Sequence, residues 1–418
     1  MSDVSGFLIP AGFRFAAATA GLKASGRPDL AVIVAGSEGD GGASAAALFT
    51  ANRVTAAPLT VDKEHLKATG GRVRVVVINA GNANCAAGQA GLDAAYATCA
   101  AAAAEFGCRP KEVFPSSTGI IGVPLPVEKL VAAMPALKAD LGPESGQSDH
   151  FQQVAQAILT TDLVEKTAFA RVVVRPGEAD GGEVRIAGLG KGSGMIHPRL
   201  VPAAPHATML MYILTDAQIE PAVLQGMLNR AVEVSFNRIS VDGDTSTNDT
   251  VLLLASGASG VRIAADDLEF ATALTQVATS LARQVVADGE GVEHVVELRV
   301  NGAASDADAV TVAKAIAHSP LVKTAWAGSD PNWGRLMAAI GNSGVEIDPE
   351  KIDIWFGALR ICRNGGRAAE MDAAAAHEYL KQPEFSITID LRQGAGHCVF
   401  WTTDLTHGYV SINADYST

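Results

Sequence analysis

Cysteine is scarce in this chain of 418 residues, which contains five scattered copies. No two stand in a CxxC pair, and that spacing argues against a zinc knuckle or a redox dithiol. The nine histidines likewise form neither HExxH nor a comparable ligand spacing. We therefore expect reduced, mostly buried cysteines, no metal site and no bound cofactor.

Positive charge and long apolar runs are also in short supply. The chain carries 32 Lys and Arg against 45 Asp and Glu, which gives a net charge of −13. Because nucleic-acid affinity rests on basic groups that neutralise phosphates, we expect no nucleic-acid partner. No apolar stretch approaches the roughly 18 residues of a membrane span, and the N-terminus lacks the pattern of a signal peptide. These absences predict a cytoplasmic protein without membrane contact and leave small zwitterionic substrates as a compatible class.

What the sequence does contain is an alternation of apolar, strand-like runs and helix-like stretches. This pattern predicts an α/β (α+β) fold of layered mixed sheets flanked by helices. Strands are predicted at 30–35, 73–78, 172–174, 184–187, 209–214, 251–255, 295–300, 352–359, 385–391, 399–402 and 409–412. Helices are predicted at 92–106, 220–234, 266–287, and from an N-cap at Ser305 through His318.

Three polar or glycine-rich stretches interrupt this alternation. The segment 115–122 (PSSTGIIG) predicts a turn whose N–H groups and hydroxyls can converge on an oxyanion. The run 188–194 (GLGKGSG) matches neither a P-loop nor GxGxxG, and it predicts a flexible loop that presents Lys191. In the loop 235–250, Asp242, Asp244 and Asp249 lack EF-hand spacing and are predicted to brace the backbone. Each stretch is also compatible with a purely structural turn.

The stretch 190–217 contains the most suggestive junction in the chain. Thr208 follows a small residue, Ala207, and opens an apolar run. Most threonines in such a place are β-branched residues that begin a buried strand. Cleavage of the Ala207–Thr208 bond would instead set the hydroxyl beside its own α-amine, which activates a weak nucleophile.

Taken together, these segments resemble the ornithine acetyltransferase (glutamate N-acetyltransferase) family of arginine biosynthesis. The resemblance spans nearly the whole chain, and the number and order of its motifs make it specific. The matching motifs are GFRFAAATAGLK, INAGNANCAAGQAG, SSTGIIG, TTD, KGSGMI, ATML, FNRISVDGDTSTNDTVLLLASG, DGEG, SPLVKTAWAGSDPNWGR and YVSINADYST.

The resemblance implies self-cleavage between Ala207 and Thr208. The products would be an alpha chain, 1–207, and a beta chain, 208–418, associated as α2β2. It further implies that Thr208 carries the acetyl group as an ester. The remaining implied site residues are Thr118 and Gly119 as the oxyanion hole, with Thr161, Lys191, Thr208, Glu290, Asn413 and Thr418 in contact with substrate. The adjacent Thr160 is an alternative to Thr161.

The implied reaction moves an acetyl group from N2-acetylornithine to L-glutamate by a ping-pong cycle, with acetyl-CoA as a candidate second donor. Two alternatives remain open: a self-processing amidohydrolase or aminopeptidase, and an uncut homologue that binds amino acids without catalysis. Two departures from the family pattern bear on this choice. One is the longer connection 201–206 before the scissile bond, and the other is Val292-Glu293-His294 after DGEG.

Overall fold

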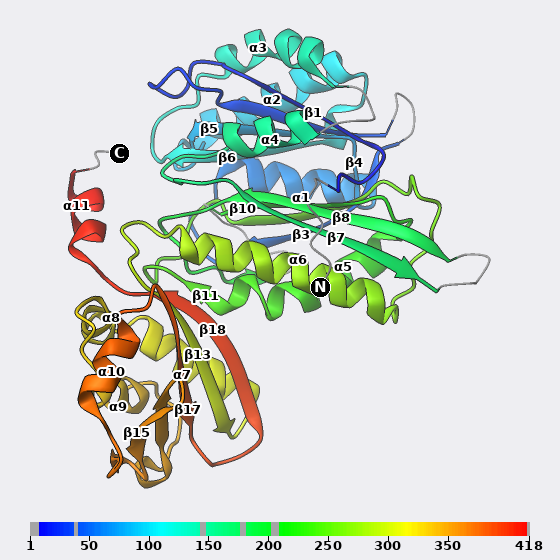
Figure 1. Ribbon diagram of the computed structural model, residues 1–418. Coiled ribbons are helices and arrows are strands. Elements are labelled where there is room, and N and C mark those ends of the chain that lie inside the picture. The colour runs from blue at the N-terminus through cyan, green and yellow to red at the C-terminus, as the bar shows by residue number, and fades with distance from the viewer. Residues whose placement is uncertain (1–7, 37–40, 143–147, 176–180, 202–208, 416–418) are drawn as a thin grey trace.

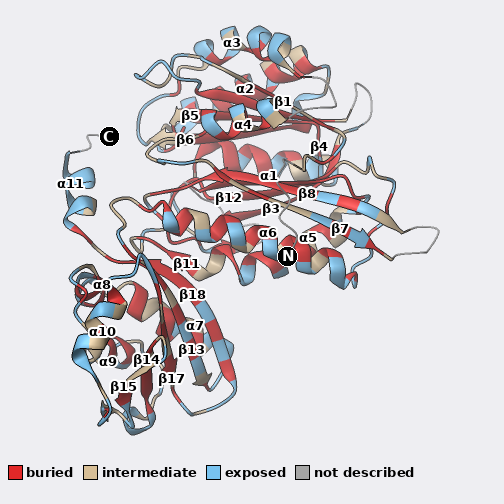
Figure 2. Cartoon of the chain, in the orientation of Figure 1, coloured by how far each residue is buried: buried red, intermediate tan, exposed pale blue. Residues whose placement is uncertain are grey.

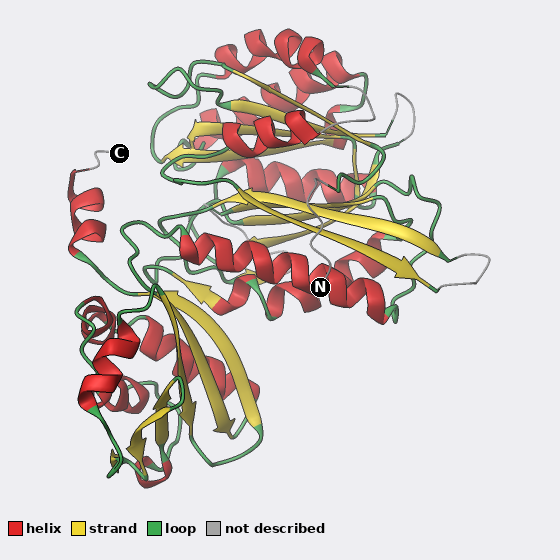
Figure 3. Ribbon diagram, in the orientation of Figure 1, coloured by secondary structure: helices red, strands yellow, loops and turns green. Residues whose placement is uncertain are grey.

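The computed structural model describes residues 8–36, 41–142, 148–175, 181–201 and 209–415. Within these residues the strands form three sheets (Figures 1 and 3). Two sheets stack face to face with helices outside them, and the third forms a separate C-terminal lobe with its own helices.

The first sheet has the order β1 (Phe13–Ala18), β2 (Leu30–Ala35), β5 (Val75–Asn82), β6 (Val113–Ile120). The second has the order β4 (Arg72–Val73), β3 (Ala43–Thr50), β12 (Thr250–Ala255), β10 (Leu210–Thr215), β8 (Gly182–Lys191), β7 (Lys166–Val174), and β9 (Leu200–Val201) pairs with β3. The third has the order β11 (Ile239–Ser240), β18 (Gly396–Thr403), β13 (Val295–Ala303), β17 (Glu384–Asp390), β14 (Asp353–Phe356), β15 (Leu359–Arg363), β16 (Gly366–Arg367). The α-helices are α1 (Ala57–Thr69), α2 (Gly88–Phe106), α3 (Val127–Asp140), α4 (Ser148–Ala157), α5 (Pro221–Glu233), α6 (Leu268–Ala287), α7 (Asp306–Ala317), α8 (Pro320–Ala327), α9 (Trp333–Gly341), α10 (Ala373–Leu380) and α11 (His407–Asp415).

The central strands are buried on both faces, which explains their continuous apolar sequences. On β10, Leu210 and Tyr212 pack toward the first sheet, while Met211 and Ile213 pack toward α5 and α6. Figure 2 shows these strands in the buried colour and the outer helix faces exposed. The period of two along each strand therefore produces a helix–sheet–sheet–helix sandwich.

Several predicted elements are confirmed with shifts of a few residues. The strand at 30–35 is β2, and the helix at 220–234 is α5, Pro221–Glu233. Ser305 caps α7 as expected, because its Oγ accepts a hydrogen bond from Asp308 N at 3.2 Å. Local signals sufficed for these elements because their packing and capping agree with their propensities.

Three predictions about local structure are wrong. The turn expected at 115–122 is largely strand, since β6 continues to Ile120, and the loop expected at 188–194 begins as strand, since β8 continues to Lys191. In both places the segment pairs with a neighbouring strand, β10 for β8 and β5 for β6. The glycine-rich sequence gives no local sign of this pairing. The strand expected at 409–412 lies in α11, where the Thr406 hydroxyl accepts from Tyr409 N at 3.3 Å and begins the helix.

No helix among the described residues has the length and apolar character needed to cross a bilayer.

The end of β6 approaches β5 too closely for any side chain. Gly119 pairs with Gly81 across the parallel ladder, and their φ angles are 131° and 110°. A Cβ on Gly119 would lie 2.3 Å from the carbonyl carbon of Gly81. Glycine is therefore required at 119 both by backbone conformation and by space.

We expect Gly119→Ala to lower the thermal melting temperature more than Gly122→Ala. Gly122 also has a positive φ, 82°, but nothing lies within 4 Å of a Cβ added there. The control therefore loses only the conformational cost, about 1–2 kcal/mol. Gly119→Ala loses a further 1–3 kcal/mol or so from overpacking. Equal melting temperatures for the two variants would show that the β5–β6 contact relaxes freely.

Candidate active site

Lys191 lies at the end of β8 and is 1% exposed, so it is not the surface lysine that a glycine-rich loop suggested. Strand β10 runs alongside it, and Leu210 is its partner in the ladder. Its Nζ lies 3.5 Å from Asp162 Oδ2 and 3.5 Å from Thr118 Oγ1. A buried ammonium needs such partners, because an uncompensated charge in the interior is costly.

Asp162 is the hub of a buried chain of alternating charges. Its Oδ1 accepts from Gly192 N at 2.6 Å and from Lys166 Nζ at 2.7 Å. Lys166 Nζ also bonds Asp288 Oδ2 at 2.5 Å. Burial by itself would raise the pKa of Asp162, but the ammonium groups of Lys191 and Lys166 outweigh it and hold that pKa well below its usual range. The Asp162 carboxylate is therefore ionised and ties the two lysines together.

Thr118 and Gly119 close the other side of Lys191. Thr118 is fully buried at the end of β6, and the Lys191 ammonium donates to its hydroxyl oxygen, which leaves the hydroxyl proton free to donate elsewhere. The preceding residue, Ser117, is held by its hydroxyl to Asn79 Oδ1 at 2.6 Å and by its carbonyl to Asn248 Nδ2 at 2.7 Å. The predicted oxyanion residues are thus set rigidly beside the buried lysine.

Glu290 and Asn413, which the resemblance assigns to substrate binding, contact each other. Asn413 Nδ2 donates to Glu290 Oε2 at 3.0 Å. The Glu290 carboxylate packs on Gly194, where an added Cβ would lie 2.4 Å from its Cδ, and Glu290 N donates to Ser193 O at 3.3 Å. Glu290 is therefore joined to Lys191 through three intervening residues of one loop.

The two neighbouring threonines before Asp162 have different surroundings. Thr160 donates its N–H to Asp162 Oδ2 at 3.1 Å, and its hydroxyl lies 3.5 Å from the same oxygen. Thr161 is half-buried, and its hydroxyl forms no hydrogen bond within the described part of the chain. The hydroxyl of Thr161 is consequently the one left for another partner.

Ala207, Thr208 and Thr418 lie outside the described residues. The residue that follows Thr208 is described, and it is firmly held. Met209 N donates to Asp249 Oδ1 at 2.6 Å, and Met209 O accepts from Thr250 N at 2.8 Å. Because Leu210 then pairs with Lys191, the chain enters β10 next to the buried lysine.

The aspartates of the loop 235–250 bear out their predicted bracing role at two positions. Asp242 accepts from Met195 N at 2.7 Å and Ile196 N at 2.9 Å, and Asp249 accepts from Met209 N. These bonds fasten the segments on both sides of 202–208. Asp244 makes no such contact through its side chain in the described part of the chain.

Asp162, Lys166 and Asp288 are site residues that the sequence analysis did not single out. Asp162 belongs to the TTD motif, and Asp288 is the first residue of DGEG. Their presence in these motifs is the only sequence feature that could have marked them as site residues. The ion pair between Lys166 and Asp288 joins residues that are 122 positions apart, and no local sequence pattern reveals such a pair.

One cluster with metal-ligand chemistry occurs among the described residues. The ligand atoms of Glu293, His294 and Asp404 lie within 4.8 Å of one another. His294 Nδ1 lies 2.8 Å from Asp404 Oδ2, and Glu293 N donates to Asp404 Oδ1 at 3.2 Å. Both oxygens of the Asp404 carboxylate thus already have hydrogen-bond partners within the cluster.

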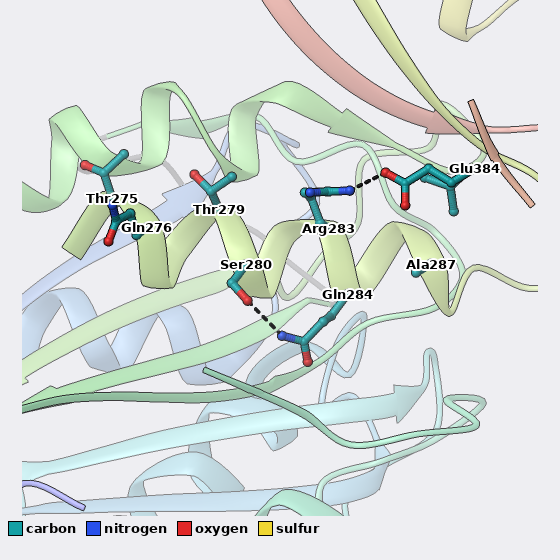
Figure 4. Close-up of a pocket in the computed structure, with 9 residues that line it drawn as sticks. Thr275, Gln276, Thr279, Ser280, Arg283, Gln284, Ala287 and Glu384 are labelled. Carbon is teal, nitrogen blue, oxygen red and sulfur yellow. Dashed lines mark hydrogen bonds and ion pairs between the residues drawn. The ribbon is translucent and has the colours of Figure 1, made fainter. Parts of the chain in front are cut away.

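A pocket on the outer face of α6 contains no comparable set of groups (Figure 4). It is lined by Thr275, Gln276, Thr279, Ser280, Arg283, Gln284, Ala287, Val295 and Glu384. Arg283 turns to Glu384, and Ser280 accepts a hydrogen bond from Gln284, so these polar groups satisfy one another. The groups around Lys191 therefore remain the candidate active site.

Known proteins resemble this chain along most of its length. Residues 14–418 match the model of the ArgJ family. The "Arginine biosynthesis bifunctional protein ArgJ" of Geobacter sulfurreducens is 43% identical over 97% of this chain and 99% of its own length. Among solved structures, the bifunctional ArgJ protein of Bacillus halodurans is 42% identical over 48% of this chain and 96% of that chain, with a TM-score of 0.47. The ornithine acetyltransferase of Mycobacterium tuberculosis, complexed with ornithine, is 37% identical over 46% of this chain and 94% of that chain, with a TM-score of 0.40. The chain described here belongs to the ArgJ family.

Proposed function

We propose that this chain transfers an acetyl group from N2-acetylornithine to L-glutamate through an acetyl ester on Thr208. Membership in the ArgJ family identifies it as an N-acetyltransferase that acts on small molecules. One observation carries the specific reaction: Lys191 and Thr118 lie 3.5 Å apart beside the strand that begins just after Thr208. The products are ornithine and N-acetylglutamate.

The nucleophile arises by cleavage between Ala207 and Thr208, which makes the α-amine of Thr208 a general base for its own hydroxyl. The resulting chains, 1–207 and 208–418, stay together because β8 of the first pairs with β10 of the second. β3 of the first likewise pairs with β12 of the second. Two such pairs associate as α2β2.

In the first half-reaction the Thr208 hydroxyl attacks the acetyl carbonyl of N2-acetylornithine, and its α-amine accepts the proton. The Thr118 hydroxyl and the Gly119 N–H stabilise the tetrahedral oxyanion, and the Lys191 ammonium adds positive charge behind Thr118. The amine of ornithine then leaves. Glutamate enters, its amine attacks the ester, and free Thr208 is regenerated.

Substrate recognition is divided between the two charged groups of the site. Lys191 contacts the substrate carboxylate, and Glu290, held by Asn413, takes the substrate ammonium. Thr161 and Thr418 complete the contacts. Thr161 is favoured over Thr160 because Thr160 is already bonded to Asp162.

Acetyl-CoA is a second acyl donor in this proposal, and no cofactor is needed. Glutamate acetylation supported by acetyl-CoA alone tests that donor. The hydrolase alternative is tested by the turnover of the acyl-enzyme: glutamate accelerates it for a transferase and leaves it unchanged for a hydrolase.

The first prediction from this mechanism concerns self-cleavage. Fresh wild-type protein should give two bands of about half size on a denaturing gel, whereas Thr208→Ala should give one band at 43.0 kDa and no acetyl transfer. Thr208→Ser keeps a hydroxyl, so it should still be cut. A single wild-type band together with full activity would contradict the mechanism, whereas a single band without activity would favour the uncut, non-catalytic homologue.

A second prediction concerns Asp162. Asp162→Asn keeps the shape but removes the charge shared by Lys191 and Lys166, so kcat/KM should fall about 10- to 100-fold, the value of one charge-assisted bond. The matched variant Asp288→Asn removes an equal charge from Lys166 alone and should reduce kcat/KM less. KM, kcat and melting temperature are measured for both. If Asp162→Asn and Asp288→Asn lose the same activity and the same melting temperature, the role of Asp162 is purely structural.

The third prediction concerns the C-terminus. Deletion of Ser417 and Thr418 should lower kcat/KM at least about tenfold through loss of a substrate hydrogen bond, without a change in melting temperature. Ser417→Ala retains Thr418 and serves as the control. Full activity in the truncated enzyme would show that Thr418 does not contact the substrate.

A further inference from the structure

A second pocket lies in the C-terminal lobe, among α7, α8 and α9. Its volume of about 790 Å³ falls within the range of small-molecule sites. It is lined by Thr311, Lys314, Ala315, His318, Ser319, Pro320, Leu321, Asn332, Gly334, Arg335, Ala338, Ala339, Asn342 and Ser343. Much of this lining belongs to the SPLVKTAWAGSDPNWGR motif, which the acetyl-transfer site does not use.

The lining is basic in a protein whose net charge is −13. Lys314, His318 and Arg335 all face the pocket, and the described lining residues include no aspartate or glutamate. Among the described residues, no carboxylate oxygen forms an ion pair with Lys314 or Arg335. Two half-buried cations without a carboxylate in direct ion-pair contact are an arrangement that a bound anion would stabilise.

The hydrogen-bond capacity of these side chains is largely unused. Arg335 Nη1 donates to Leu321 O at 2.7 Å, which orients the guanidinium and leaves its other N–H groups available to a ligand. Burial, followed by repulsion from Arg199 and Arg238, lowers the pKa of Lys314, and attraction to Glu233 offsets part of this effect. Burial, Lys323 and Lys314 lower the pKa of His318 to about 4, so at neutral pH this ring is an uncharged donor or acceptor.

Two helices begin at the pocket and add to its positive character. Ser319 caps α8, where its Oγ accepts from Val322 N at 3.4 Å. Asn332 caps α9, where its Oδ1 accepts from Arg335 N at 3.2 Å. Both caps line the pocket, and the N-terminal ends of helices favour anions.

We propose that this pocket binds the phosphate groups of a small phosphorylated metabolite. A guanidinium with free N–H groups, a lysine ammonium and two helix N-termini match the charge and the acceptor oxygens of phosphate. Two sources share this chemistry: the nucleotide end of a phosphorylated acyl donor such as acetyl-CoA, and a free phosphorylated effector. The first source rests on the acetyl-transfer function, whereas binding itself does not.

The pocket is also connected to the active-site loop. His318 Nε2 lies 3.1 Å from Ser240 Oγ, and its ring packs 4.3 Å from that of His197. Asp242 binds the backbone of Met195 and Ile196, which directly follow the Gly194 on which Glu290 packs. A ligand in contact with His318 would therefore lie next to the loop 235–250, which binds the backbone beside Gly194 and Glu290.

Isothermal titration of the whole enzyme with pyrophosphate and with adenosine 3′,5′-bisphosphate tests binding. We expect saturable binding to the wild type, and Lys314→Gln and Arg335→Gln should each raise Kd about tenfold or more. Lys351→Gln is the matched control, because Lys351 is an exposed lysine of the same lobe paired with Asp348 at 3.1 Å. Absence of saturable binding, or unchanged Kd in both pocket variants, would overturn the proposal.

Kinetics of the same variants identify the source. If the acyl donor binds here, Lys314→Gln raises the KM for acetyl-CoA relative to that for N2-acetylornithine by about tenfold. If both constants are unchanged while pyrophosphate affinity is lost, the ligand is a free effector, and the pocket assignment stands. Thr208→Ala protein should still bind pyrophosphate, so failure of the acetyl-transfer mechanism and failure of this pocket remain distinguishable.

Discussion

Burial of the Lys191 ammonium is the constraint on which the candidate site depends. The protein meets it with a chain of alternating charges in which Asp162 joins Lys191 to Lys166 and Asp288 closes the far end. The two cations and two anions balance within this cluster, and hydrogen bonds to Gly192 N and to Thr118 Oγ1 add further partners. The cost of disrupting such a network holds Lys191 at the end of β8, within reach of Thr118.

The second requirement is a close junction between the two stacked sheets. β6 brings Thr118 from one sheet, β8 brings Lys191 from the other, and β10 begins beside them. Gly119 permits β6 to lie against β5 with a φ of 131°, and Asn248 fastens the end of β6 to the loop before β12. Elements from both sides of 202–208 thus converge on Lys191.

The C-terminal lobe contributes to the site and is more than an appended unit. α11 leaves this lobe and returns toward the sandwich (Figure 1), where Asn413 meets Glu290. Lys323, buried in the same lobe, donates to Val241 O at 2.8 Å and Thr403 O at 2.6 Å, and so holds the loop 235–250 against β18. Glu290 is therefore positioned by contacts between the sandwich and the lobe.

The amino-acid sequence determined the class of fold, the buried strands such as β2, the helix caps such as Ser305, and the family to which Thr118, Lys191 and Glu290 belong. These depend on periodicity, capping and motif order, all of which are local or can be read along the chain. Tertiary structure alone decided that Lys191 ends a strand, that 409–412 is helical, and that Asp162 and Asp288 share Lys166. The reason is physical: hydrogen bonds of a strand and partners of a buried charge come from residues far away in sequence, and only the folded chain brings them within 3 Å or so of one another.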